Sequence, residues 1–124
     1  MTYRYNIRIL QGSSYNQSFT YATYTGSGIL LDSSLATAVD LTGYSARLQI
    51  RHNHNSDIVL HEATTQNAQI SILAPSGSVT INIPASVTDT FDFDEGYYDL
   101  EIYNGTLVNR LLEGNVVVSK QITK

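Results

Sequence analysis

The chain has 124 residues, enough for one domain that buries about two-thirds of the surface its unfolded form would expose. It has no cysteine, which excludes a disulfide framework and a thiolate metal site. The formal net charge is −4, and no Lys or Arg occurs between Arg51 and Arg110, so the clustered basic residues that follow nucleic-acid phosphates are missing.

The apolar residues exclude two further classes. No segment approaches the roughly eighteen apolar residues of a membrane-spanning helix. The N-terminus has no basic stretch followed by an apolar core. We therefore expect a soluble protein that is not exported through a cleaved signal, with neither nucleic acid nor membrane as a partner.

Short runs of alternating apolar and polar residues predict an all-β domain, and no apolar pattern of helical period persists along the chain. Pro84 cannot continue a strand ladder, so residues 84–90 are predicted as a short helical turn or loop. The predicted strands, in chain order, lie around Tyr5, Ile7 and Ile9, over residues 15–24, 29–32 and 46–51, around Ile58 and Leu60, around Ile70 and Ile72, and over residues 79–83, 97–103 and 107–118.

The acidic stretch between Phe91 and Thr106 is either a metal-binding or catalytic site or a structural corner of the fold. Asp94, Gly96 and Tyr98 have the spacing Asp-x-Gly-x-Tyr, which resembles the corner of immunoglobulin-like sandwiches where a tyrosine hydroxyl bonds back to the corner's backbone. We therefore predict that Tyr98 anchors this corner and that Asp94 caps turn amides. The predicted fold is a single immunoglobulin-like β-sandwich over residues 1–124, with seven to nine antiparallel strands.

Asn104-Gly105 predicts a two-residue hairpin with a type I′ turn. The register counted from this turn pairs Tyr103 with Thr106, Glu101 with Val108, and Asp99 with Arg110. The same count turns Asn109 inward opposite Leu100, so a bulge is expected there. Arg47 and Arg51, on the strand predicted to lie on the other side, are further candidate partners for the two acidic residues.

Carboxylates near the corner are candidate calcium ligands. Asp92, Asp94 and Glu95, with Asp89 nearby, offer several oxygen atoms from one loop, as calcium prefers. The stretch lacks the glycine and the terminal glutamate of an EF-hand loop. We interpret these carboxylates as corner and surface residues.

Histidines form the second candidate metal site. His52, His54 and His61 have side chains that zinc accepts, but the first two fall in a turn rich in Asn and Ser, where ligands are poorly fixed. Gly26-Ser27-Gly28 lacks the spacing of a hydrolase nucleophile elbow. We therefore predict no enzyme, no cofactor, and no catalytic, cofactor-binding or metal-binding residue.

Tyrosine is abundant, with nine residues, and can form core or contact platforms. Alternation places four on inward faces: Tyr5, Tyr15, Tyr21 and Tyr98. It leaves three exposed: Tyr24, Tyr97 and Tyr103.

Five segments together carry a resemblance. The most specific is Asp-Leu-Thr-Gly-Tyr-Ser-Ala-Arg-Leu-Gln-Ile-Arg at residues 40–51. The others are Ile-x-Ile-x-Gln-Gly at 7–12, Ser-Gly-x-Val-Thr-Ile-x-Ile-Pro-Ala at 76–85, Tyr-Asp-Leu-Glu-Ile at 98–102, and Arg-Leu-Leu-Glu-Gly-x-Val-x-Val-Ser at 110–119. Over nearly its full length the chain resembles small proteins and domains encoded by tailed bacteriophages and prophages.

The resemblance implies an immunoglobulin-like structural component of the virion, in the tail, baseplate or fibre, assembled in the host cytoplasm. Such a protein packs against other virion proteins, often in a homo-oligomer, and no catalytic residues carry over. The insertion from Gly28 to Val39, where related sequences have a tight turn, is a candidate contact surface. The alternative is a carbohydrate-binding or host-attachment module that binds a host-surface glycan through loops. A third reading is a metal-dependent enzyme using His52, His54 and His61.

Overall fold

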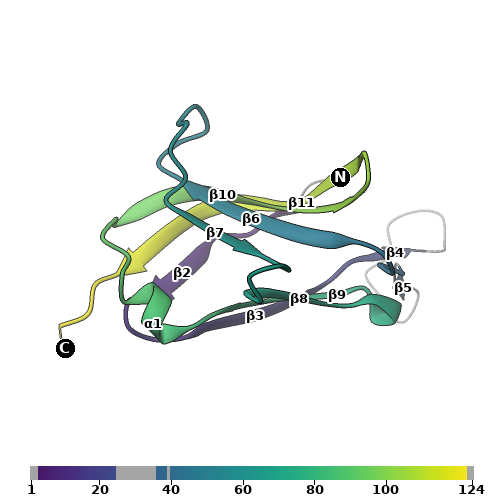
Figure 1. Cartoon of the computed structure of the whole chain (residues 1–124), viewed down its shortest axis with the longest axis horizontal. Helices are drawn as coiled ribbons and strands as arrows, with labels where there is room; N and C mark the ends of the chain where they lie inside the picture. The colour runs from purple at the N-terminus through teal and green to yellow at the C-terminus, as the bar shows by residue number, and fades with distance from the viewer. Residues whose placement is uncertain (1–2, 25–35, 39, 123–124) are drawn as a thin grey trace.

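The computed structural model describes residues 3–24, 36–38 and 40–122. The chain folds into two facing β-sheets with a two-stranded ribbon at one end (Figure 1). Its strands are β1 (Tyr3–Arg4), β2 (Ile7–Leu10), β3 (Tyr15–Thr20), β4 (Ala22–Tyr24), β5 (Ala36–Ala38), β6 (Ser45–Arg51), β7 (His61–Thr64), β8 (Ile70–Leu73), β9 (Ser78–Ile83), β10 (Glu95–Asn104) and β11 (Leu107–Ser119). Two short helices interrupt them, the 3-10 turn η2 (Ala74–Ser76) and α1 (Ala85–Thr88).

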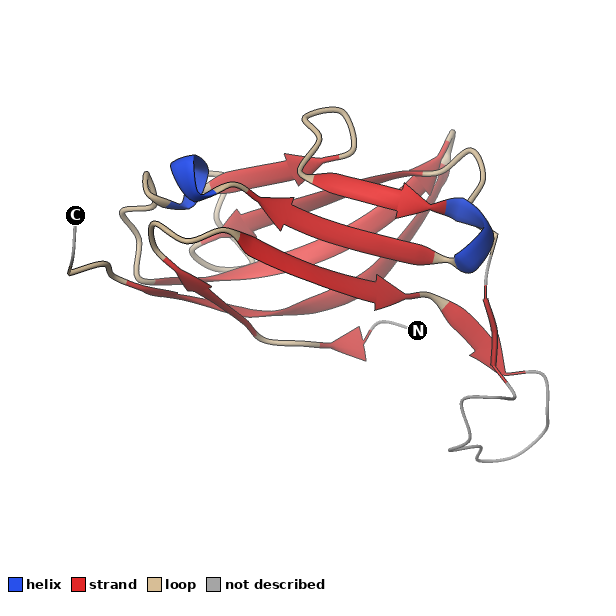
Figure 2. Cartoon of the chain, turned by 90° about the horizontal axis from the view of Figure 1, so that it is seen from below, coloured by secondary structure: helices blue, strands red, loops and turns tan. Residues whose placement is uncertain are grey.

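The larger sheet has the order β1-β11-β10-β6-β7, and β2 also pairs with β11. Strands β10, β11, β6 and β7 are antiparallel neighbours, whereas β1 and β2 both run parallel to β11. The smaller sheet is antiparallel with the order β3-β9-β8. Figure 2 shows the molecule with this smaller sheet facing the viewer. Strands β4 and β5 form the ribbon.

One hydrophobic core fills the space between the two sheets. Strand β6 alternates partly exposed and buried residues along its whole length, so every second side chain points inward. Leu48 and Leu100 from the large sheet and Ile81 from the small sheet are almost fully buried in the same cluster. Each such side chain contributes about 1.5–3 kcal/mol when removed from water. The two sheets therefore stabilise each other.

Tyr98 is buried, as predicted, but its hydrogen-bond partner is not the one expected. Its hydroxyl donates to the backbone carbonyl of Tyr5 at 2.5 Å, not to the corner before β10. Tyr5 and Asn6 lie where the N-terminal strand is interrupted between β1 and β2, and the phenol binds the chain at this gap. The predicted partner was wrong because the long-range pairing of the N-terminal segment was not visible in the local sequence.

The hairpin between β10 and β11 also differs from its prediction. Asn104 pairs with Leu107, so the turn residues are Gly105 and Thr106. Only Gly105 has a positive φ, of 61°, which matches a type II′ turn and contradicts type I′. A glycine at the first central position supplies all the backbone freedom that this turn needs.

The turn lies one residue later than predicted, which moves the pairing of the two strands by two residues. Glu101 lies opposite Arg110, and a bulge after Leu100 then places Asp99 opposite Glu113. The expected bulge is therefore present, and Asn109 lies opposite the buried Ile102, not Leu100, and is itself exposed. The extra residue allows Leu111 and Leu112 both to be buried.

The observed strand positions confirm most of the other strand predictions and correct two of them. Strands β6, β8, β9, β10 and β11 lie where they were predicted, and α1 is the predicted helical turn. Ile58 is 68% exposed in a loop, and the strand predicted around it is instead β7, three residues later. Residues 36–38 form a strand within the predicted loop, while the strand predicted at 29–32 lies outside the described residues.

The strand number and direction also need correction. Among the described residues there are eleven strands, more than seven to nine, because the first two predicted strands are each split and the ribbon adds another. The all-β prediction is confirmed, but the pairings of β1 and β2 are parallel. Neither helix among the described residues has the length and apolar character needed to cross a membrane.

Candidate functional site

The outer face of the large sheet collects the chain's arginines. By register, Arg47 and Arg51 on β6 and Arg110 on β11 lie on this face with the acidic residues of β10. Arg4 pairs with Glu113, and Arg8 with the exposed Val117, so they also point outward. These are all five arginines of the sequence. The face is charged but carries both signs.

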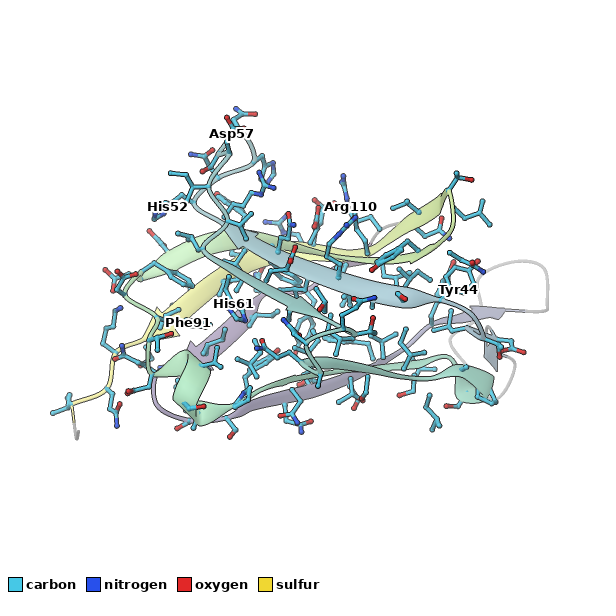
Figure 3. The ribbon with its side chains drawn as sticks, viewed as in Figure 1. Tyr44, His52, Asp57, His61, Phe91 and Arg110 are labelled. Atoms are coloured by element: carbon cyan, nitrogen blue, oxygen red, sulfur yellow. The ribbon has the colours of Figure 1, made fainter. Side chains whose placement is uncertain are left out.

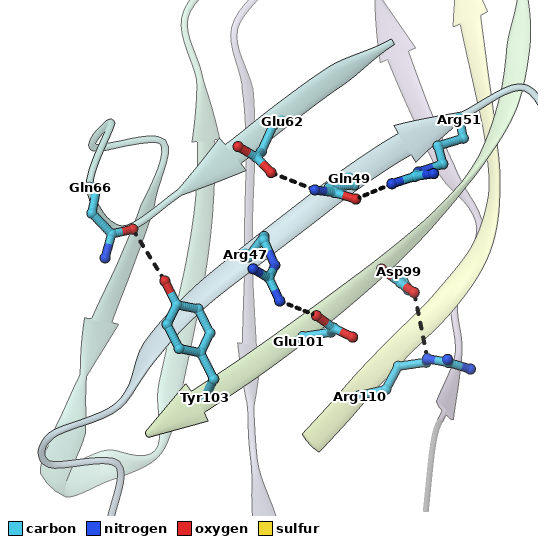
Figure 4. A network of polar contacts seen from close by, with 9 residues as sticks. All are labelled: Arg47, Gln49, Arg51, Glu62, Gln66, Asp99, Glu101, Tyr103 and Arg110. Carbon is cyan, nitrogen blue, oxygen red and sulfur yellow. Dashed lines mark hydrogen bonds and ion pairs between the residues drawn. The ribbon is translucent and has the colours of Figure 1, made fainter. Parts of the chain in front are cut away.

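Two ion pairs tie β10 to its neighbours (Figure 4). The Nη2 atom of Arg47 lies 2.8 Å from Oε1 of Glu101, and its guanidinium lies 5.1 Å from the ring centre of Tyr103. The Nε atom of Arg110 lies 3.5 Å from Oδ2 of Asp99. Both pairings were predicted, although Asp99 and Arg110 meet diagonally across the bulge and not directly opposite each other.

A chain of hydrogen bonds continues across β6 to the loop that follows it (Figure 4). Gln49 donates to Glu62 at 2.6 Å and accepts from Nη2 of Arg51 at 2.9 Å. Nη1 of Arg51 donates to the carbonyl of Ser56 at 2.6 Å. Arg51 therefore holds the β6–β7 loop, which rises above the sheet and carries His52 and Asp57 (Figure 3).

A groove of about 460 Å³ lies between this loop and the outer face of β10 and β11. Its lining includes three arginines and three carboxylates, so it is polar and balanced in charge. Tyr97 is 38% exposed there, and the ring of His54 meets it edge-on at 4.8 Å. The residues that line it are Arg47, Gln49, Arg51, Asn53, His54, Tyr97, Tyr98, Asp99, Glu101, Arg110 and Glu113.

The electrostatic environment of Asp99 reflects this crowding. Burial raises the pKa of its carboxyl group above the usual value, and the nearby negative charge of Glu101 raises it further. Arg110 and Arg51 act in the opposite direction. The cations of the groove thus compensate only part of the cost of ionising Asp99.

The acidic residues before and at the start of β10 do not converge. Asp89, Asp92, Asp94 and Glu95 are exposed, and no group of three His, Asp or Glu side chains arranged for a metal ion occurs among the described residues. The Asp94 carboxylate lies 3.9 Å from Nζ of Lys120. It caps no amide in the part of the chain that the structure describes, contrary to the prediction.

The three histidines lie apart. His54 packs on Tyr97, whereas His61 points to the other side of the large sheet, where its ring lies 5.0 Å from that of Phe91. Nε2 of His61 lies 2.7 Å from Oε1 of Gln69. His52 is exposed on the loop (Figure 3). The structure therefore does not bring the zinc candidates together.

The tyrosines mostly follow the predicted faces. Tyr15 and Tyr21 pack against the core, and Tyr97 is exposed as predicted. Tyr5 was predicted inward but is 39% exposed, with its ring edge-to-face against Phe19 at 5.1 Å. Tyr103 is half-buried, not exposed, because Arg47 covers its ring. The side chain of Tyr24 lies outside the described residues.

The chain matches no protein-family model and no curated protein.

The groove is assembled from residues up to 66 positions apart in the sequence, with Arg47 first and Glu113 last. Sequence reasoning identified its ion pairs but missed the groove itself, including Gln49 and Asn53. The only available signal was that polar residues alternate at outward positions on predicted neighbouring strands.

Proposed function

We propose that the chain is an immunoglobulin-like sandwich that serves as a non-catalytic structural part of a bacteriophage virion, in the tail, baseplate or fibre. It acts through contacts with other virion proteins, within a homo-oligomer. It is assembled in the host cytoplasm and binds neither nucleic acid nor membrane.

The strand order is the observation that supports the immunoglobulin-like assignment. Strands β11, β10, β6 and β7 correspond in order to G, F, C and C′ of such sandwiches, and β3, β9 and β8 correspond to B, E and D. Tyr98 departs from the usual corner because it bonds to Tyr5. The order of strands in both sheets nevertheless agrees with this class.

The placement in a virion is supported by the resemblance to phage-encoded sequences. The segments that carry it fall on β2, β6, β9, β10 and β11, which supply most of the core of both sheets. The loop between β6 and β7 and the outer faces of both sheets lie outside these core positions, so they are available to define partners. Because residues 25–35 and 39 are not described, the candidate contact surface from Gly28 to Val39 stays a prediction.

Mass spectrometry of purified phage particles tests this proposal. Particles from the strain that encodes the chain are separated on a density gradient, and peptides of the chain are quantified in each fraction. We expect the chain to follow the particle proteins at a fixed ratio. A chain found only in the soluble lysate fractions, with particles free of it, contradicts the proposal.

A further inference from the structure

We propose that the groove on the outer face of the large sheet binds a neutral oligosaccharide, with Tyr97 as the platform for one sugar ring. This goes beyond the proposed function, and it can hold whether or not the chain is part of a virion. The argument rests on the charge balance, the hydrogen-bonding groups and the aromatic ring of the groove.

The charge of the groove favours an uncharged ligand. The lining holds equal numbers of arginines and carboxylates, and Arg47–Glu101 and Arg110–Asp99 are already ion-paired. An anionic or cationic ligand would have to compete with these internal partners. A neutral polyhydroxy ligand carries no charge that must compete with these pairs, and its hydroxyls can bond to the carboxylate and amide groups of the lining.

The hydrogen-bonding groups of the groove are planar and held in place. Arg51 is fixed by the neutral acceptors Ser56 and Gln49, while Gln49 is itself held by Glu62. Carboxylate, amide and guanidinium groups can each bond to two neighbouring hydroxyls, as on a pyranose ring. Fixing them beforehand lowers the entropy lost on binding.

Tyr97 supplies the apolar contact that a sugar needs. Its ring is exposed above the polar floor of the sheet, and His54 supports one side of it. A sugar ring has an apolar face of C–H groups that can cover such a ring and remove it from water. The volume of about 460 Å³ falls within the range of about 300–1,000 Å³ that small-ligand sites occupy.

The outer face of the small sheet offers a contrast within the same molecule. It carries Asn16, Ser18, Thr80 and Asn82, and its hydroxyls bond to each other, with Ser18 and Thr80 at 2.8 Å. Among the described outward residues of β3 and β9 there is neither an aromatic ring nor a charged group. Thr80 is therefore a suitable position for a control substitution.

Binding is tested with the full chain on an array of neutral and acidic oligosaccharides, followed by calorimetry with each hit. We expect a neutral oligosaccharide to bind and Tyr97→Ala to weaken its Kd by about tenfold or more, because the stacking surface is removed. Tyr97→Phe, which keeps the ring, and Thr80→Ala, on the other sheet, should stay within about threefold of the unchanged protein. Circular dichroism checks that each variant is folded.

Four results overturn the inference: no neutral oligosaccharide binds, only acidic ones bind, the groove binds protein ligands instead, or Tyr97→Ala leaves sugar affinity unchanged. Amide NMR shifts induced by the hit locate the contact. They should include Arg51, Tyr97 and Asp99, and shifts confined to β3 and β9 also contradict it. The particle analysis above reports on the proposed function separately, so either proposal can fail alone.

Discussion

Tyr98 links the centre of the large sheet to the N-terminal segment through one hydroxyl group. The residue is only 4% exposed, and its hydroxyl donates to the carbonyl of Tyr5 where the edge strand is interrupted. A buried polar group that loses its partner costs more than a typical hydrogen bond contributes. This single contact should therefore have a measurable effect on stability.

We expect Tyr98→Phe to lower the free energy of unfolding by about 1–3 kcal/mol, because it leaves the Tyr5 carbonyl without its donor. Urea denaturation followed by circular dichroism measures the change. Tyr97→Phe, at an exposed position of the same strand, is the control and should change stability by less than about 0.5 kcal/mol. Equal effects of the two substitutions would show that the Tyr98 bond contributes nothing specific.

The same burial predicts a loss of stability in alkali. Burial raises the pKa of Tyr15 to about 12 and also raises that of Tyr98, in each case with a smaller contribution from Tyr5. In the unfolded chain these tyrosines lose their protons near the usual pKa of about 10. Their contribution to the free energy of unfolding is therefore fully present below that pH, and it is lost as the pH rises toward the pKa values of the folded state. The urea concentration at the midpoint of unfolding should therefore decrease as the pH is raised from about 9 to about 11.

Tyr15→Phe provides the check, because phenylalanine has no proton to release. The slope of stability against pH in this range should be smaller in the variant than in the unchanged protein. A slope that does not change would show that Tyr15 ionises alike in the folded and unfolded states.

Strand β11 can accept its parallel neighbours only because Gly114 has no side chain. A Cβ atom there would collide with the backbone carbonyl of Tyr5, between β1 and β2. We expect Gly114→Ala to destabilise the protein by about 1–3 kcal/mol and to speed amide exchange over Ile7–Leu10.

Gly105→Ala is the matched control for this edge. Gly105 has a φ of 61° and open space around it, so alanine there adds backbone strain of about 1–2 kcal/mol without touching the N-terminal strand. Amide exchange over β2 should stay unchanged. If both variants loosen β2 alike, the close approach of Gly114 to Tyr5 is not what controls this edge.

Pairing between β6 and β10 includes the Arg47–Glu101 ion pair, whose side chains are 40% and 23% exposed. A double-mutant cycle with Arg47→Met and Glu101→Gln should give a coupling energy of about 0.2–1 kcal/mol that decreases with added salt. If no coupling energy is found even at low salt, any stabilisation by Arg47 comes from its packing on the ring of Tyr103 and not from the ion pair.

Strands with strong alternation were predictable from the sequence, and strands without it were not. Strands β6, β9 and β10 were placed nearly to the residue because each carries three buried apolar residues in alternation. Strand β7 was missed because His61–Thr64 has one buried apolar side chain, whereas the exposed Ile58 and Val59 nearby have stronger strand propensity.

Register and the groove depended on information that local sequence does not carry. The hairpin turn was misplaced by one residue because Asn-Gly favours one turn locally, whereas burial of Leu111 and Leu112 favours another. The Asp99–Arg110 ion pair formed despite this error because long side chains reach diagonal neighbours. The groove required the position of the β6–β7 loop above the sheet, which no periodicity predicts.

Both sheets contribute to one core, so we expect the domain to unfold in a single transition. Ile7 and Ile9 from the N-terminal edge join the same buried cluster as Ile81 and Leu100. Calorimetric and van't Hoff enthalpies of unfolding should therefore agree. A calorimetric enthalpy clearly larger than the van't Hoff value would reveal that the two sheets separate in steps.

The parallel pairing of β2 with β11 also determines how the domain transmits mechanical load. Parallel neighbours start at the same side, so the chain enters β2 at one side of this strand pair and leaves β11 at the other. Tension between the ends pulls β2 and β11 past each other along their length, and all their backbone bonds resist together. Pulled in this way, the domain should behave as a stiff tether between whatever is attached at its two ends.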